Sequence, residues 1–188
     1  MQLQTDILIR PYRLEDIAPS YEAIMESVSE IQPFLPWCHP GYTLHEARTW
    51  VETQVTQFQA GKVFEFVIVS DDGRFLGGCG LNTIDWGNRR ANLGYWVRSS
   101  ATRHGAATAA TRLLARWGFE NTTLNRLELI ISTENLASLR VAAKAGAVHE
   151  GILRSRLFLH GDSHDAAVFS FTRQDFETGR LRSTELTS

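Results

Sequence analysis

The chain has little cysteine and no long apolar run, and each absence excludes a class of protein. Its 188 residues include two cysteines, Cys38 and Cys79, which lie far apart and form no C-x-x-C pair. Neither a disulfide framework nor a thiolate metal cluster is therefore indicated, and we expect reduced thiols. No segment approaches the roughly 18 uninterrupted apolar residues that a membrane span needs. The opening MQLQTDILIRPYR alternates polar and apolar residues like a first strand and unlike a signal peptide, so we expect a cytoplasmic protein.

Charge of one sign is also scarce. The formal net charge is −2, the isoelectric point is near 6.3, and no basic run of five or more residues occurs. Such a balance gives no reason to expect a nucleic acid as partner. What is present is the composition of a globular protein, with 43% hydrophobic and 21% charged residues. At this length we expect one domain, residues 1–188, with its core at about 5–172 and a C-terminal tail at 173–188.

The first half of the chain predicts a strand, two helices and an antiparallel meander. The strand is ILIRPYR, and it is followed by a helical region that we expect Pro19 to interrupt. A capping box, Thr43 with Glu46, opens a second helix that ends near Gly61. Short turns rich in Asp, Asn and Gly then join three strands, VFEFVIV, FLGGCGLNTI and ANLGYWV.

The second half alternates helix and strand. A helix, AATAATRLLARWGFENT, precedes the strand RLELIIS, and Asn135 can cap a short helix that stops at Gly146. Two more strands surround a Gly-Asp-Ser turn. The order predicts a mixed α/β (α+β) domain around one central sheet.

The stretch SATRHGAAT, residues 100–108, lies where a strand gives way to a helix, which is a place that can hold an anion. It is not a P-loop, because no Gly-Lys-[Ser/Thr] follows the strand. It is not a dinucleotide fingerprint either, because Gly105 is the only glycine of a G-x-G-x-x-G. The small residues Gly105, Ala106 and Ala107 instead allow backbone N–H groups and a helix end to meet a pyrophosphate.

The arrangement LGYWV, TRHGAA and ENLASLRVAAKAGAVHEGILR resembles the GNAT acyltransferases, and more narrowly the branch that acetylates ribosomal-protein N-termini. The likeness spans about residues 5–172. The family's acyl-CoA motif, Q/R-x-x-G-x-G/A, falls on residues 102–107, where Thr102 replaces the usual Gln or Arg. The resemblance implies a single, mostly antiparallel twisted sheet of about seven strands, splayed at the cofactor site, with four helices on its faces. It also implies acetyl-CoA as co-substrate and no metal.

The resemblance further implies which residues contact the cofactor. The strand before the loop would splay from its neighbour and offer free backbone groups to the pantetheine arm. An exposed N–H near Val97 would lie beside the thioester carbonyl, where a donor stabilises an oxyanion, which gives Val97 a catalytic role beside Ser138. The basic side chains of the loop would meet the phosphates. The implied cofactor contacts are Tyr95, Trp96, Val97, Arg103, His104, Gly105, Ala106, Ala107, Asn135 and Ser138.

Asn135 and Ser138 are spaced i, i+3, so they share one helix face. In the resembled branch the Asn contacts the cofactor and the Ser lies near its sulfur, which makes Ser138 our candidate for the acid that protonates the thiolate. Many other family members use a tyrosine later on this helix, where this chain has Ala142. The alternative from the residues alone is a helix cap and a surface hydroxyl.

A general base is harder to find. An amine is mostly protonated at neutral pH, so some group must take its proton before attack. The family often has an acidic residue on the strand before the loop, but the position here is Asn92, and an amide cannot act as a base. Glu128, Asp165, the nearby histidines and an ordered water stay as candidates.

Three other stretches contain residue types that can carry function. The loop residues Leu35, Pro36 and Trp37 match the wall of the acceptor pocket in the resembled branch. Cys38 and His39 could suggest a thiol nucleophile, but adjacent residues rarely reach that geometry. HGDSHD contains metal-ligand types, yet its Gly-Asp-Ser core is typical of a hairpin, so we expect no metal there.

The sequence therefore predicts an N-acetyltransferase that moves the acetyl group of acetyl-CoA to a primary amine by direct attack in a ternary complex. The resemblance favours a protein N-terminal amine of the ribosomal type as acceptor. A small-molecule amine acetyltransferase and a non-catalytic acyl-CoA-binding module stay open, and the missing lysine disfavours a nucleotide-binding domain. We expect a monomer or homodimer, with no direct nucleic-acid or membrane partner.

Overall fold

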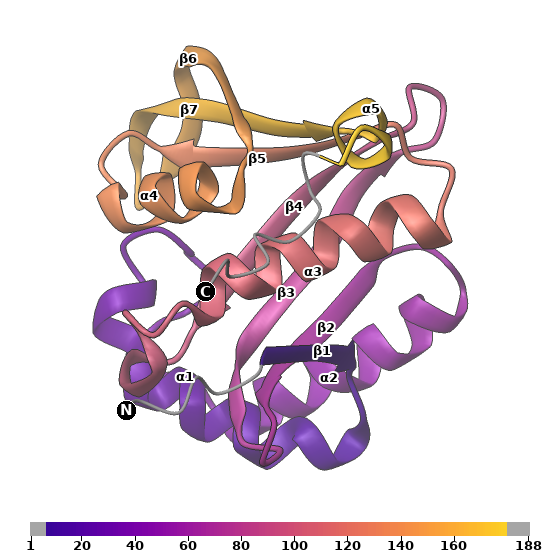
Figure 1. Cartoon of the computed structure of the whole chain (residues 1–188). Helices are drawn as coiled ribbons and strands as arrows, with labels where there is room; N and C mark the ends of the chain where they lie inside the picture. The colour runs from indigo at the N-terminus through magenta and orange to yellow at the C-terminus, as the bar shows by residue number, and fades with distance from the viewer. Residues whose placement is uncertain (1–6, 180–188) are drawn as a thin grey trace, which may run out of the picture.

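A computed structural model describes residues 7–179, which fold around one seven-stranded sheet (Figure 1). The sheet order is β1-β2-β3-β4-β5-β7-β6, and all neighbours are antiparallel except β4 and β5. The strands are β1 (Ile7–Pro11), β2 (Phe64–Ser70), β3 (Phe75–Asp85), β4 (Arg90–Val97), β5 (Arg126–Ser132), β6 (Val148–Leu159) and β7 (Asp162–Thr172). The α-helices are α1 (Ile17–Ile31), α2 (Leu44–Gln59), α3 (Ala106–Asn121), α4 (Leu136–Ala145) and α5 (Arg173–Glu177), and the 3₁₀ helices are Leu14–Asp16 and Ser99–Ala101.

The expected mixed α/β class and the three-strand meander are confirmed. The helix count differs slightly, because the described residues contain five α-helices where four were expected. The fifth, α5, lies in the segment that we expected to be a tail. It forms there because Thr172 and Asp175 build a capping box at its start, with Thr172 Oγ1 donating to Asp175 Oδ2 at 2.6 Å.

Alternating side chains on β2 pack into two different cores, one on each face of the sheet. Phe66 and Ile68 belong to the larger core, which α3 completes with residues such as Leu114. Val67 and Val69 pack on the opposite face, in the core to which α1 and α2 contribute. Successive side chains of a strand point to opposite faces, and both faces are buried here, so the sequence of β2 is a nearly continuous apolar run.

Strands β4 and β5 pair at one end only. Their parallel register joins Arg90–Asn92 to residues 126–128, and the rest of β4, from Leu93 to Val97, has no partner on β5. Figure 1 shows the two strands diverging toward the left of the view, with β5, β6 and β7 above and β1 to β4 below. The expected splay is therefore present.

Two of the predicted helix starts are confirmed, and the predicted break is wrong. Thr43 Oγ1 accepts from Glu46 N at the start of α2, and Asn135 Oδ1 accepts from Ser138 N at the start of α4. Pro19, expected to interrupt the first helix, is the third residue of α1. The helix tolerates it there because the N–H groups of the first turn have no intrahelical partner to lose.

Within residues 7–179, no helix is long and apolar enough to cross a membrane.

Candidate active site

The loop before α3 has the backbone shape of an anion cradle. Arg103 and Gly105 have positive φ angles of 66° and 84°, and Gly105 is the N-cap of α3. Among the described residues, no side chain caps this helix, so its first N–H groups have no side-chain acceptor there. A Cβ built on Gly105 meets no atom within 4 Å, which means that the helix end faces open space. These features fit the pyrophosphate of an acyl-CoA.

The remaining predicted residues of the loop have different exposures. Ala106 is buried against the core and Ala107 is half-buried, whereas Arg103 and His104 are exposed. Their side chains therefore lie in solvent at the edge of the cradle.

A set of hydrogen bonds fastens this loop to α1. Ser100 N donates to Glu26 Oε1 at 2.7 Å, Ser99 N donates to Ser27 Oγ at 2.9 Å, and Arg98 Nε donates to Glu26 Oε2 at 3.0 Å. The Arg98 guanidinium and the Ser100 donors lower the pKa of Glu26 to about 2. The start of the cradle is thus held by charge-assisted bonds.

Tyr95 and Ser138 meet across the splay. Their hydroxyl oxygens, Tyr95 Oη and Ser138 Oγ, are 2.7 Å apart, and Tyr95 Oη also donates to the Ser138 carbonyl at 3.2 Å. Burial raises the pKa of Tyr95 to about 12, so the phenol is neutral near pH 7. The helix-cap interpretation of Asn135 holds, because its Oδ1 accepts from Ser138 N at 3.0 Å. Trp96 and Val97 follow Tyr95 on β4, and Val97 ends the strand.

A cavity of about 830 Å³ lies beside β4 on the α1 and α2 side of the sheet. It exists because β3 and β4 present glycines there instead of side chains: Gly78 and Gly94 line it. Aromatic rings supply much of its wall, which is typical of a site for an organic ligand. The rings are those of Tyr12, Trp37, Tyr42, Trp50, Tyr95 and Trp96.

Of the three residues expected to wall an acceptor pocket, two line this cavity. Leu35 and Trp37 line the cavity, and the Trp37 and Trp96 ring centroids are 6.2 Å apart. Pro36 is exposed and does not line it. The neighbouring Cys38 is buried, and His39 bonds Glu46 Oε1 at 3.0 Å instead of a thiol.

The cavity contains a carboxyl group that the sequence interpretation missed. Glu65 on β2 is paired with Gly80 on β3, and its Oε1 accepts from Asn82 Nδ2 at 3.2 Å. Asn82 Oδ1 in turn accepts from Asn92 Nδ2 at 3.0 Å. Asn92, which replaces the family's acidic residue on β4, is therefore linked to Glu65 through the Asn82 side chain. Burial raises the pKa of Glu65 to about 7.

One signal in the sequence could have identified Glu65. It is a lone charged residue between two aromatic ones in an otherwise apolar strand, FEFVIV. A charge at a buried strand position needs a reason, either a partner or a ligand.

The two carboxyl groups named from the sequence as candidates for the base have other partners. Glu128 Oε1 accepts from Arg126 Nε at 2.7 Å, and its other oxygen lies 3.4 Å from an Arg90 nitrogen. Asp165 Oδ1 accepts from Ser155 N at 2.9 Å. Neither side chain lines the cavity.

The histidines of HGDSHD lie at the hairpin of β6 and β7. His160 Nε2 is 2.7 Å from the Gln32 carbonyl, and His164 Nδ1 is 3.4 Å from Glu134 Oε2. Asp162 begins β7 on the same hairpin. Over the described part of the chain, no group of three or more His, Cys, Asp or Glu residues is arranged to hold a metal ion.

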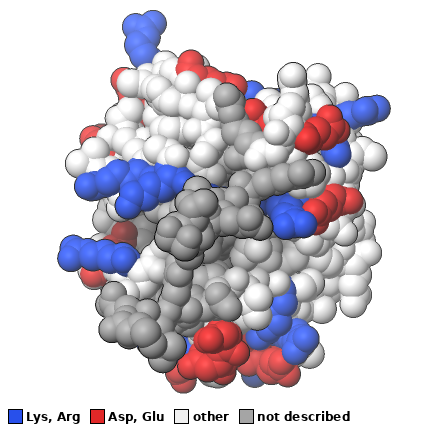
Figure 2. Space-filling model, in the orientation of Figure 1, with Lys and Arg blue, Asp and Glu red and all other residues white. Residues whose placement is uncertain are grey.

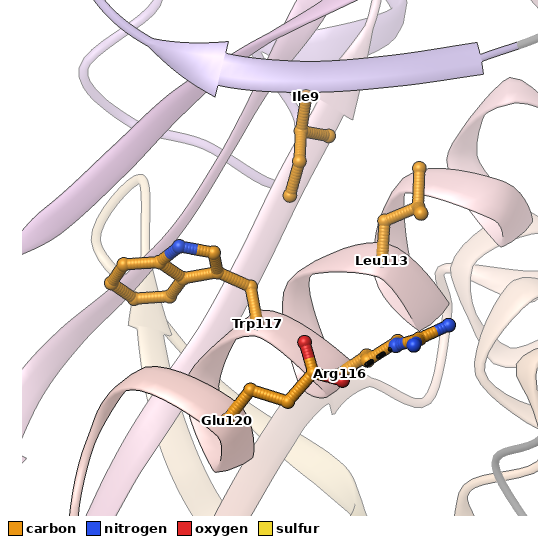
Figure 3. A pocket seen from close by; sticks show the side chains of 5 residues that line it. All are labelled: Ile9, Leu113, Arg116, Trp117 and Glu120. Carbon is orange, nitrogen blue, oxygen red and sulfur yellow. Dashed lines mark hydrogen bonds and ion pairs between the residues drawn. The ribbon is translucent and has the colours of Figure 1, made fainter.

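A second, smaller hollow of about 270 Å³ lies between β1 and α3 (Figure 3). Ile9 points into it from β1, and Leu113 and Trp117 line it from the helix. Its charged residues, Arg116 and Glu120, pair with each other at 2.8 Å. The lining of this hollow therefore consists of apolar side chains and one ion pair, which indicates packing between β1 and α3 and not a reactive site.

A splayed strand, a loop with the backbone shape of an anion cradle and a separate cavity on the α1 and α2 side of the sheet thus lie together at β4. The acetyltransferase (GNAT) domain family matches residues 6–148, and the chain therefore belongs to the GNAT family. This membership confirms the expected family, the acetyltransferase class, and acetyl-CoA as the acyl donor.

Individual relatives are similar at modest identity. YdaF of Bacillus subtilis (strain 168) is 33% identical over 106 residues, which are 56% of this chain and 58% of the length of YdaF. The ribosomal-protein-serine acetyltransferase of Escherichia coli (strain K12) is 27% identical over 154 residues, 82% of this chain and 86% of that protein. The structure of Mycobacterium smegmatis RimJ in complex with CoA-disulfide superposes with a TM-score of 0.83 at 26% identity, covering 93% of this chain and 86% of RimJ.

Proposed function

We propose that this protein transfers the acetyl group of acetyl-CoA to a primary amine by direct attack within a ternary complex. One observation carries the proposal: the unpaired part of β4 has the cradle of α3 at its end and the glycine-lined cavity on its other face. Tyr95 belongs to both regions, since it lines the cavity and bonds Ser138. Donor and acceptor can therefore meet at one strand.

The proposed donor site follows β4 and the loop. Backbone groups of Tyr95, Trp96 and Val97 would bond the pantetheine arm, and the N–H groups at the start of α3 would bond the pyrophosphate. Figure 2 shows basic side chains at the left edge of one face, next to α4 and the loop before α3, which favours phosphate groups there. Bound acetyl-CoA supplies the activated thioester that the amine attacks.

The proposed acid is the hydroxyl pair at α4. Ser138 Oγ and Tyr95 Oη share a hydrogen bond of 2.7 Å, so a proton leaving one can be replaced from the other. Ser138 would deliver that proton to the departing thiolate, and Asn135 would hold the first turn of α4 in place.

A protein N-terminal amine of the ribosomal type is the proposed acceptor. The support is the named activity of the Escherichia coli relative and the volume of the cavity, about 830 Å³, which can hold the first residues of a chain. A small amine would also fit a cavity of this volume. The proposal includes a single domain and, because ribosomal proteins are the acceptors, a cytoplasmic location.

Thermal unfolding with acetyl-CoA, ATP and NAD at equal concentrations tests donor binding first. Acetyl-CoA at 100 times its dissociation constant should add about 2.7 kcal/mol of stability, and the other two should add none. Acceptors follow by thiol release, comparing Ser- and Ala-starting peptides with N-terminally blocked copies and with spermidine. No shift with saturating acetyl-CoA would refute the proposal, and release with spermidine alone would replace the protein acceptor by a small amine.

A further inference from the structure

Two polar groups at the floor of the cavity have few partners. The Tyr12 hydroxyl is buried and, within the described residues, has no hydrogen-bond partner. Across residues 7–179, Asn82 is the one side chain or backbone group that bonds the Glu65 carboxyl group. A buried polar group with so few partners needs an explanation, and a catalytic or binding role is one.

The sheet is built to leave room for these groups. A Cβ on Gly80 would lie 1.9 Å from Glu65 Oε2, and a Cβ on Gly78 would lie 2.6 Å from Tyr12 Oη and 2.8 Å from Trp96 Nε1. The two glycines are neighbours on one face of β3. Any other residue at either position would displace a polar group from the cavity.

We propose that Glu65 binds the ammonium group of the acceptor at the floor of the cavity and takes its proton before attack, with Asn82 and Asn92 positioning the carboxylate. The proposal rests on the proposed function, because it assumes an amine that enters the cavity. It assigns the general base to a strand two positions away from the one on which the resembled family often has it.

The proton balance of the step is complete. The ammonium group gives one proton to the Glu65 carboxylate and becomes a neutral amine. Its nitrogen forms a bond to the thioester carbonyl carbon, and the carbon–sulfur bond breaks. The thiolate gains a proton from the hydroxyl pair of Ser138 and Tyr95, which the second amine proton restores, and the proton on Glu65 is released to solvent after the product leaves.

The charges around Glu65 suit an ammonium ligand. Tyr12 and Cys79, on neighbouring elements, interact electrostatically with Glu65, and burial raises the pKa of both, so both are neutral. His45 and Glu46 line the cavity from α2, and no lysine or arginine of the described residues does so. A positive ligand therefore meets carboxyl groups and aromatic rings, to which cations bind well.

The test measures kcat/KM from pH 5.5 to 9 with a Ser-starting peptide, in wild type, Glu65→Gln and the control Glu52→Gln. Glu52 is an exposed residue on α2 outside the cavity. We expect wild type to show a rising limb with a midpoint near pH 7, the pKa that burial gives Glu65. Glu65→Gln should lose that limb and about 100-fold or more of kcat/KM, while acetyl-CoA affinity stays within about twofold. Activity within about threefold of wild type, with the limb retained, would overturn the proposal.

Asn82→Ala separates positioning from structure. Removing its hydrogen bond to Glu65 takes away an interaction that lowers the pKa of the carboxyl group, so the limb should move to higher pH while KM for acetyl-CoA is unchanged. A variant that merely loosened the fold would lower the yield of active protein without moving the limb. An unmoved limb would contradict the positioning role.

A measurement without turnover keeps the two proposals distinct. Carbon-13 NMR of labelled glutamate follows the Glu65 carboxyl group, assigned by its loss in Glu65→Gln, with and without the Ser-starting peptide. A midpoint near 7 that falls when the peptide binds supports an ammonium site, even if no acetyl transfer is seen and the proposed function fails. A midpoint below about 5, or no response to the peptide, would overturn it.

Discussion

Replacing Glu65 by Gln should stabilise the protein at alkaline pH. Burial raises the pKa of this carboxyl group from 4.5 to about 7, so the folded state holds its proton more tightly than the unfolded chain does. Below pH 4.5 both states are protonated and the group has no net effect. Between pH 4.5 and 7 the unfolded chain loses the proton first, and wild-type stability falls.

The size of this effect follows from the two pKa values. At about 1.4 kcal/mol for each pKa unit, the cost reaches about 3 kcal/mol at pH 8 and is about 1 kcal/mol or less at pH 5. Glutamine has nearly the same shape, keeps an oxygen for the Asn82 hydrogen bond and avoids the charge. The variant should therefore gain about 3 kcal/mol over wild type at pH 8 and little at pH 5.

Urea denaturation at pH 5 and pH 8 measures the difference. With a slope of about 2 kcal/mol per molar, the midpoint at pH 8 should rise by about 1.5 M urea. The control is Glu128→Gln, which removes a carboxylate paired with Arg126 and Arg90 and should gain nothing at either pH. A gain that is equal at both pH values, or absent at pH 8, would refute the assignment of a buried, strained charge to Glu65.

Three further predictions concern other parts of the site. Ser138→Ala removes the hydroxyl that meets Tyr95 at 2.7 Å, so it should lower kcat by about 10- to 100-fold in a thiol-release assay. Calorimetry should find its acetyl-CoA affinity unchanged. An unchanged kcat would reject Ser138 as the acid. Gly80→Ala should cost about 1 to 3 kcal/mol in thermal unfolding and abolish transfer, since its Cβ would overlap Glu65; normal activity would contradict the packing. Glu26→Gln should lower the free energy of unfolding by about 1 kcal/mol at pH 7, because the low pKa of Glu26 stabilises the fold above pH 4.5. The difference from wild type should shrink as pH falls from 4.5 toward 2. A constant difference on acid titration would argue against the role of Glu26 in holding the loop before α3.

Local chemistry explains which elements the sequence predicts well. Thr43 with Glu46 and Asn135 with Ser138 satisfy helix ends by contacts three residues apart, so the signal lies within one window of sequence. The prediction for Pro19 failed because the local pattern did not show where the helix begins. A proline is tolerated in the first turn of a helix and breaks the helix farther in. Because a 3₁₀ helix occupies Leu14–Asp16, α1 begins only at Ile17 and Pro19 lies in its first turn.

The missed carboxyl group shows where local patterns end. Its neighbours, Gly80 and Asn82, come from β3, and Asn92 comes from β4, so their meeting depends on strand register. Register is set by the whole sheet and by its turns. A search along the strand before the cradle finds only Asn92, whereas Glu65 lies two strands away.

The one-ended pairing of β4 and β5 makes the cofactor a structural element as well as a reactant. Backbone groups from Leu93 to Val97 lack a strand partner on one side, and such an open edge normally invites another chain to add to the sheet. Here the edge lies between two halves of the same sheet, because β5, β7 and β6 continue the sheet from the paired end of β4. In the proposed complex the pantetheine arm would act as that missing strand, so the sheet would become continuous only while the enzyme holds its substrate.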